Sequence, residues 1–252
     1  MLGPGECKDA VKKAIDIGFR HIDTAQYYDN EKQVGDGIAA SKINRDEITI
    51  ATKVWIDKLG CDDVIKSTLH SLENLHLSFV DILYIHWPAQ TYNPRETLKA
   101  FSQLVDEGKV RFIGVANFTP RLINEAIEIC DKPIIANQVE HHPLLQQREM
   151  RAYLEKRNMY LVAYSPLARR RILNQPVIMQ IAQRHHATPS QVTLSWIMEH
   201  RAIPIPKAAN PAHIQENFDS LQIKLDKEDI DKINSISIEK RIINPPGIAP
   251  PW

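Results

Sequence analysis

Short runs of apolar, often β-branched residues alternate along the chain with longer segments in which apolar residues recur every three or four positions. The short runs predict strands over residues 19–23, 48–53, 80–86, 111–117, 134–139, 160–164 and 202–207. Most of these runs are apolar almost throughout, which is typical of parallel strands buried on both faces. The alternation of such strands with helices predicts a parallel sheet covered by helices.

Several of the predicted helices have readable ends. One begins at the N-cap residue Thr119, and another begins at Thr188 with a glutamine at the capping-box position. The helix over 6–17 stops at Gly18, and the helix over 97–106 is also followed closely by a glycine. These signals separate the strands with helices of ordinary length.

The fold class predicted by this pattern is α/β, as a single domain over residues 1–252. An open doubly wound sheet has the same alternation, but no Gly-x-Gly-x-x-Gly follows a strand, which counts against a Rossmann dinucleotide fold. A closed (β/α)8 barrel runs to about 250 residues and needs eight strands. Seven are found, so a first strand ahead of Met1 is expected to be missing from this sequence.

Composition narrows the class of protein. The chain has 252 residues, is 43% hydrophobic and 25% charged, and has a net charge of zero. These values are typical of a soluble globular protein and lack the basic footprint of a nucleic-acid binder. No apolar run has the length of a membrane span. The three dispersed cysteines indicate reduced thiols, and we expect a cytoplasmic monomer.

Polar side chains stand at or beside the end of every predicted strand. They are Asp23, Lys53, His86, Asn117, Gln138, Tyr164 and Lys207. In a parallel α/β barrel, catalytic residues gather at the carboxyl ends of the strands. Strands that simply end where polar loops begin explain only part of this set, because it includes an acid, a base and a histidine. The strand ends therefore predict an active site.

Four residues suit the donation of a proton to a carbonyl oxygen. Asp23 and Lys53 are expected side by side on adjacent strands, and a charged Lys53 favours ionisation of a nearby phenol. Tyr28 lies in the loop after Asp23, and an unperturbed tyrosine is too weak an acid for this role at neutral pH. A neutral His86 can hydrogen-bond a substrate oxygen. Such a site still needs a source of hydride.

Each of these residues also has a purely structural interpretation. Asp23 and Lys53 can form a structural ion pair, Tyr28 can pack in the core beside Tyr27, and His86 can be a satisfied buried histidine. Taken singly, Tyr28 and His86 favour the structural interpretation. Taken together, the four favour catalysis.

The sequence resembles the aldo-keto reductases, and the motifs are specific. They are GFRHIDTAQYYDNE over 18–31, TKVW over 52–55, HWP over 86–88, GVANF over 114–118, NQVE over 137–140, and IPK at 205–207 followed by EN at 216–217. The likeness runs in order from about residue 6 to the end. It implies a (β/α)8 barrel whose N-terminal hairpin and first strand are missing here, binding NADPH without a Rossmann domain.

The resemblance implies a role for each matching residue. Tyr28 is the implied general acid, Lys53 assists it, Asp23 holds Lys53, and His86 orients the carbonyl. The implied cofactor contacts are Asn117, Gln138, Tyr164, Ser165, Leu167, Lys207, Asn210, His213, Glu216 and Asn217. The implied aromatic walls of the substrate pocket are Trp55 and Trp87.

Two departures from the family pattern affect the cofactor. The family usually has a serine where Ala116 stands, and loss of that hydrogen bond is expected to cost about 0.5–1.5 kcal/mol of cofactor binding. The family's Lys-Ser…Arg clamp on the 2′-phosphate reads here as Lys207, Ala208 and His213. NADPH is therefore expected with NADH as an alternative. The arginines at 169–171 either compensate or form a solvated face.

A third departure is the missing hairpin, and we expect translation upstream of Met1 to restore a strand. The short Pro-rich tail over 241–252 resembles that of small prokaryotic reductases, which implies small aldehydes, α-oxoaldehydes such as methylglyoxal, or diketo sugar acids as substrates.

Two alternative functions remain, a nicotinamide-nucleotide-sensing protein with little turnover and a Schiff-base aldolase using Lys53. The histidines at 141–142 and 185–186 are adjacent pairs with no cysteine near, so no metal site is expected.

Overall fold

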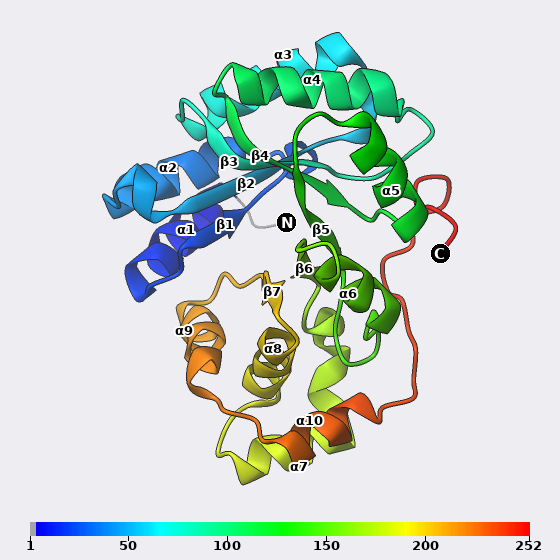
Figure 1. Ribbon diagram of the computed structural model, residues 1–252. Coiled ribbons are helices and arrows are strands. Elements are labelled where there is room, and N and C mark those ends of the chain that lie inside the picture. Colours follow the sequence, from blue (N-terminus) through cyan, green and yellow to red (C-terminus); the bar gives the residue numbers. More distant parts are fainter. Residues whose placement is uncertain (1–3) are drawn as a thin grey trace. The chain divides into compact units, whose positions relative to one another are not determined.

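The computed structural model describes residues 4–252 (Figure 1). Its strands are β1 (His21–Asp23), β2 (Thr49–Val54), β3 (Val80–Ile85), β4 (Val110–Ala116), β5 (Ile134–Glu140), β6 (Tyr160–Tyr164) and β7 (Ala202–Pro204). Its α-helices are α1 (Pro4–Ile17), α2 (Glu31–Ser41), α3 (Cys61–Leu75), α4 (Pro94–Asp106), α5 (Pro120–Ile129), α6 (Arg148–Glu155), α7 (Pro176–Arg184), α8 (Pro189–Glu199), α9 (Pro211–Asp219) and α10 (Lys227–Asn234). Among the 3-10 turns, η1 (Gln26–Tyr28) and η4 (Ala168–Asn174) lie near predicted site residues.

All seven predicted strands are present, but some end earlier than the sequence pattern indicates. His86 and Asn117 directly follow the last residues of β3 and β4, and Lys207 lies three residues beyond the end of β7. The early end of β7 has a simple cause, since Pro204 and Pro206 have no N–H to give to a sheet.

The predicted helix starts are confirmed at two caps and wrong at a third. The Thr119 side chain accepts a hydrogen bond at the start of α5, and Thr188 forms a capping box with Gln191 at the start of α8. The helix predicted over 97–106 begins three residues earlier. Its actual cap is Asn93, whose side chain accepts from two main-chain N–H groups of the first turn of α4.

The chain groups into two compact units. The first comprises the described residues up to Asn137 together with Pro245–Trp252, and the second is Gln138–Asn244. The boundary falls inside β5. A single domain over residues 1–252 therefore stays a prediction.

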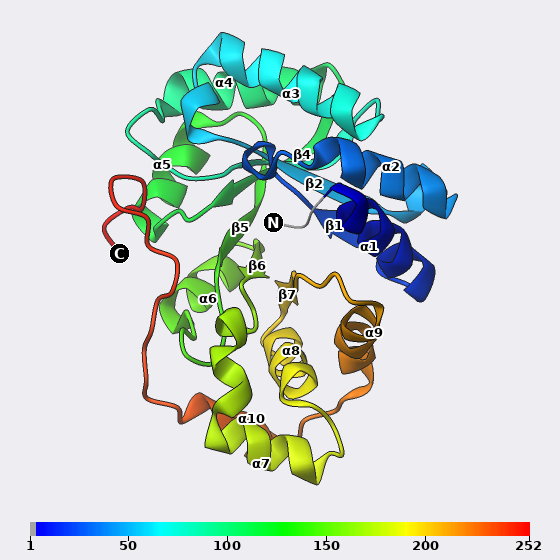
Figure 2. The same cartoon turned by 180° about the vertical axis from the view of Figure 1, so that it is seen from behind.

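In the first unit, strands that are neighbours in the chain are neighbours in the sheet, from β1 to β5. The pairs from β1 to β4 are parallel, and every residue of β3 is buried. Helices α1 to α5 pack against one another in chain order (Figures 1 and 2). Gly35 lets α2 approach α3 closely, because a Cβ there would lie 2.4 Å from the main-chain oxygen of Leu75.

In the second unit, the end of β5, then β6 and β7 follow one another, and β6 and β7 are parallel. Helix α8 contacts α7, α9 and β7 and supplies much of the core. Its Trp196 is fully buried and donates a hydrogen bond from Nε1 to Asn234 over 3.0 Å. The parallel α/β alternation predicted from the sequence is thus confirmed in each unit.

Candidate active site

A buried ion pair joins the ends of β1 and β2. Asp23 is the last residue of β1 and lies opposite Ala51, so Lys53, two positions further on, points to the same side of the sheet. The Lys53 side chain is wholly buried and its ammonium pairs with the Asp23 carboxylate. It also donates to the main-chain oxygen of Thr24 over 2.8 Å. The charge is thus held by acceptors on β1 and just beyond its end.

Tyr28 and His86 lie against this pair. Tyr28 ends the turn η1, and the Lys53 Nζ atom lies 5.3 Å from the centroid of its ring. The His86 ring, just after β3, lies edge-on to Tyr28 with 5.8 Å between the ring centroids. The structure therefore brings Asp23, Tyr28, Lys53 and His86 together from three consecutive strand ends.

His86 is held as a neutral imidazole. Burial lowers its pKa well below the usual range, and the nearby Lys53 ammonium lowers that pKa further. Its Nδ1 atom is buried and has no hydrogen-bond partner among the described residues. A buried polar atom without a partner costs free energy unless another molecule supplies one, which is a property of a binding site.

The His86 environment predicts a particular pH dependence of stability. In the unfolded chain a histidine takes up a proton below its usual pKa of about 6.5, whereas buried His86 resists protonation, so falling pH favours unfolding. We expect wild type to lose up to about 1.4 kcal/mol of unfolding free energy per pH unit more than His86→Gln below that pH. Urea titrations at several pH values measure this difference, and parallel curves for the two proteins contradict it.

Aromatic rings form a wall beside the four residues. Trp55 stacks on Tyr27 with 4.0 Å between ring centroids, and the Trp55 and His86 centroids are 5.0 Å apart. The Tyr27 and Trp55 rings line a cleft of about 580 Å³, and Asp23, Tyr28, Lys53 and His86 are not among its lining residues. Tyr27 is 52% exposed and so does not pack in the core. The contact of Tyr27 with Trp55 was not predicted from the sequence, although its position beside Tyr28 was the available signal.

The other predicted aromatic wall, Trp87, is buried and contacts the last residue of the chain. The Trp87 and Trp252 rings meet edge to face, with 6.5 Å between their centroids. Among the described residues, no ring contact joins Trp87 to Tyr28 or His86.

Carboxamide side chains tie the next strand ends together. Asn117 is fully buried, has left-handed backbone (φ 64°), and donates from Nδ2 to the His86 main-chain oxygen over 3.0 Å. Asn137 in β5 both donates to the Phe118 oxygen and accepts from its N–H, at 3.0 and 3.4 Å. The site thus continues from β3 to β5 through amide groups.

The remaining predicted cofactor residues belong to the second unit. Gln138 is buried in β5, Tyr164 ends β6, and Ser165 and Leu167 follow in a turn. Left-handed backbone occurs at Ser165 and again at 168–170 in that turn. The side chains of Arg169 to Arg171 are exposed there.

The residues predicted for the adenosine end lie around α9. Asn210 caps this helix by accepting from the Ala212 N–H over 2.8 Å. His213 lies 3.0 Å from Glu216, which also accepts from Thr188 over 2.6 Å. The exposed Lys207 precedes the helix, and Asn217 is buried on it.

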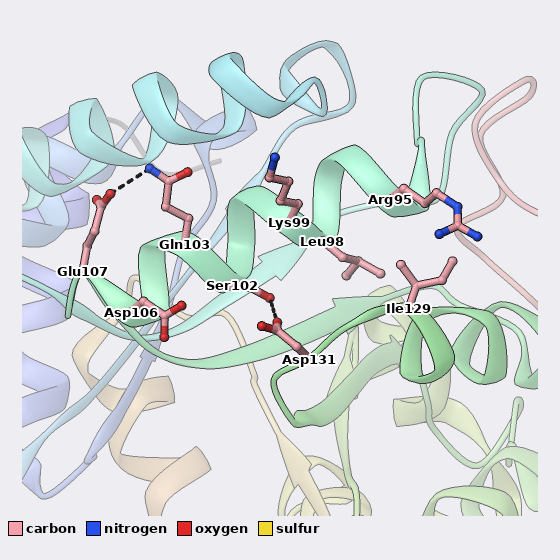
Figure 3. Close-up of a pocket in the computed structure, with 9 residues that line it drawn as sticks. All are labelled: Arg95, Leu98, Lys99, Ser102, Gln103, Asp106, Glu107, Ile129 and Asp131. Carbon is pink, nitrogen blue, oxygen red and sulfur yellow. Dashed lines mark hydrogen bonds between the residues drawn. The ribbon is translucent and has the colours of Figure 1, made fainter.

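A second cleft of about 470 Å³ lies on the first unit, along α4 and the end of α5 (Figure 3). Two hydrogen bonds join side chains that line it, with Ser102 donating to Asp131 and Gln103 donating to Glu107. None of the four residues described above lines it.

Two features are absent from residues 4–252. Within this part of the chain, no group of three or more His, Cys, Asp and Glu side chains is placed to hold a metal ion. The helices of the same residues include none with the length and hydropathy required to cross a membrane.

The sequence and fold have clear relatives. Residues 4–238 match the model of the aldo/keto reductase family. The 9,11-endoperoxide prostaglandin H2 reductase of Trypanosoma cruzi is 40% identical over 94% of this chain and 84% of its own length. The methylglyoxal reductase DkgB of Escherichia coli O157:H7 is 38% identical over 100% of this chain and 97% of its own length. A crystal structure described as a 2,5-diketo-D-gluconic acid reductase B has a TM-score of 0.96 at 35% identity, covering 100% of this chain and 90% of that one.

The chain therefore belongs to the aldo/keto reductase family. It is an NAD(P)H-dependent oxidoreductase of the α/β barrel class, as the sequence motifs predicted. Within the described residues, seven strands of that barrel are present.

Proposed function

We propose that this protein reduces small aldehydes, α-oxoaldehydes or diketo sugar acids, with Tyr28 as the proton donor. The observation that carries the proposal is the wholly buried Lys53, paired with Asp23 and 5.3 Å from the Tyr28 ring centroid. An ammonium buried this close to the phenol stabilises the negative charge that develops on the Tyr28 oxygen as its proton moves to a carbonyl. This arrangement suits an acid for a carbonyl oxygen.

His86 and the aromatic wall place the substrate in this proposal. A neutral imidazole donates a hydrogen bond to a carbonyl oxygen without competing with Tyr28 for the proton. Trp55 borders the same space, with its ring 5.0 Å from His86, and Trp87 is assigned to a second side of the pocket. Apolar rings around the carbonyl exclude water, which strengthens the hydrogen bonds to its oxygen.

The residues present fit a nicotinamide dinucleotide. Buried Asn117 and Gln138 offer both donors and acceptors, as a carboxamide requires, and the turn after β6 exposes three arginines suited to phosphates. We assign Tyr164 to the nicotinamide ring, Ser165 and Leu167 to the pyrophosphate, and the set around α9 to the adenosine end, namely Lys207, Asn210, His213, Glu216 and Asn217. A hydride for the carbonyl carbon is the chemistry that the bound dinucleotide supplies.

NADPH is the proposed cofactor, with a weaker preference over NADH than a Lys-Ser-Arg clamp provides. His213 lies 3.0 Å from the Glu216 carboxylate, so part of its capacity to attract a 2′-phosphate is already used. Lys207 is exposed and remains the principal cation at this position.

The substrate class rests on the relatives and on the site. The methylglyoxal reductase covers all of this chain, and the walls provided by Trp55 and Trp87 suit compact carbonyl compounds. The test is the loss of nicotinamide absorbance with methylglyoxal, with NADPH and NADH compared. We expect turnover with both cofactors and a higher rate with NADPH. Binding of cofactor without turnover of any small carbonyl contradicts the reductase and favours a nucleotide-sensing protein.

We further propose that the protein is monomeric and cytoplasmic. Its thiols at Cys7, Cys61 and Cys130 form no disulfide. Sedimentation of the purified protein tests the monomer, and fractionation of the cells that produce it tests the location.

A further inference from the structure

The turn that carries Tyr28 has little internal support. It spans three residues as a 3-10 turn, a geometry with poor hydrogen bonds. Its main chain closes with two such bonds, from Tyr28 N–H to the Ala25 oxygen over 3.0 Å and from Asp29 N–H to the Gln26 oxygen over 3.2 Å. The direction of the Tyr28 side chain therefore depends on groups outside the turn.

The Gln26 side chain fixes the turn through two hydrogen bonds to residues outside it. Its Oε1 accepts from the main-chain N–H of Trp55, just beyond β2, over 3.1 Å. Its Nε2 donates to the Ser71 hydroxyl of α3 over 3.2 Å. A single amide thus ties the turn to the end of β2 and to α3.

The other end of this connection is a buried carboxylate. Glu31 accepts from Thr52 Oγ1 over 2.5 Å. Burial raises its pKa, and hydrogen bonds from Thr52, Ser71 and Asn74 oppose that rise. The Trp55 main-chain N–H can only donate, so it bonds to the carbonyl oxygen of the Gln26 amide and leaves the NH2 group for the Ser71 hydroxyl. That direction fixes the orientation of the amide, with its oxygen toward Trp55.

We propose that Gln26 is a positioning residue that sets Tyr28 against Lys53. The Gln26 amide bonds to Trp55, which follows Lys53 by two residues, and Glu31 bonds to Thr52, which directly precedes Lys53. At its other end Gln26 precedes Tyr28 by two residues. The donor and the cation that assists it are therefore held by one set of hydrogen bonds. The inference rests on the proposed role of Tyr28 as proton donor.

Gln26→Met tests this, since methionine keeps the length of the side chain and removes both hydrogen bonds. Small misplacement of a catalytic group costs up to about a hundredfold in rate, and we expect kcat to fall about tenfold. The KM for the nicotinamide cofactor should be unchanged, and the solvent deuterium isotope effect on kcat should rise, because proton transfer becomes slower. Ser71→Ala should act in the same direction. Gln33→Met is the matched control, since Gln33 lines the same cleft and its Oε1 has no partner among the described residues.

Amide hydrogen exchange at Trp55 provides a second readout that does not need turnover. It should quicken in Gln26→Met and stay unchanged in Gln33→Met. An unchanged kcat in Gln26→Met, or an equal loss in Gln33→Met, overturns the proposal. If wild type reduces no carbonyl, the reductase function fails by itself. Faster exchange at Trp55 in Gln26→Met then still supports the proposal that Gln26 fixes the turn, and unchanged exchange overturns that proposal.

Discussion

Replacing Tyr28 by phenylalanine lowers kcat for methylglyoxal by about 10²–10⁴-fold, the range that a positioned general acid contributes. The change removes one hydroxyl and keeps the ring, so the contacts of the ring with His86 and with the Lys53 ammonium remain. Cofactor binding and the melting temperature should stay close to those of wild type. Steady-state kinetics with NADPH, together with cofactor titration, measure both parts of this expectation.

The matched control is Tyr27→Phe. The neighbouring ring stacks on Trp55 and is half exposed, so its hydroxyl is not expected to reach the carbonyl oxygen. This variant should keep nearly all of the activity. If Tyr28→Phe retains wild-type turnover, or if both variants lose activity equally, Tyr28 is not the proton donor.

Replacing Asp23 by asparagine destabilises the fold by about 3–5 kcal/mol, because it leaves a buried charge without its counter-ion. The Lys53 side chain is wholly buried and keeps only neutral acceptors, such as the Thr24 oxygen, after this change. Activity should fall as well, since the same ammonium assists Tyr28. Urea unfolding of the two proteins gives the difference in free energy.

Two comparisons make this result specific. Asp16 pairs with Lys12 at the surface, where both side chains are at least 40% exposed, and Asp16→Asn should cost less than about 1 kcal/mol. Adding Lys53→Met to Asp23→Asn removes the stranded charge and should recover part of the lost stability. A loss for Asp23→Asn no larger than for Asp16→Asn contradicts the buried ion pair.

The pattern of hydrophobic residues was sufficient to predict the strands, because strands buried on both faces must be apolar over their whole length. It was less accurate for their ends. Lys207 lies beyond β7 because two prolines stop the ladder, and α4 starts at a cap, Asn93, that stands ahead of its apolar stripe. The ends of strands and helices depend on single hydrogen bonds, which hydrophobic periodicity does not predict.

The motifs around Asp23, Tyr28, Lys53 and His86 determined the family and named the four residues, since residue types and spacing are properties of the sequence alone. Their mutual geometry needed the tertiary structure. Lys53 forms an ion pair with Asp23 and lies beside the Tyr28 ring only because parallel pairing sets β1 and β2 in register. The neutral state of His86 likewise follows from its burial and from the nearby ammonium. The hydrogen bonds from the Gln26 side chain reach Trp55 and Ser71, which lie 29 and 45 positions further along the chain. Nothing in the local sequence indicates these bonds. Residue identity is local information, whereas register, burial and long-range hydrogen bonds arise only when distant segments pack together.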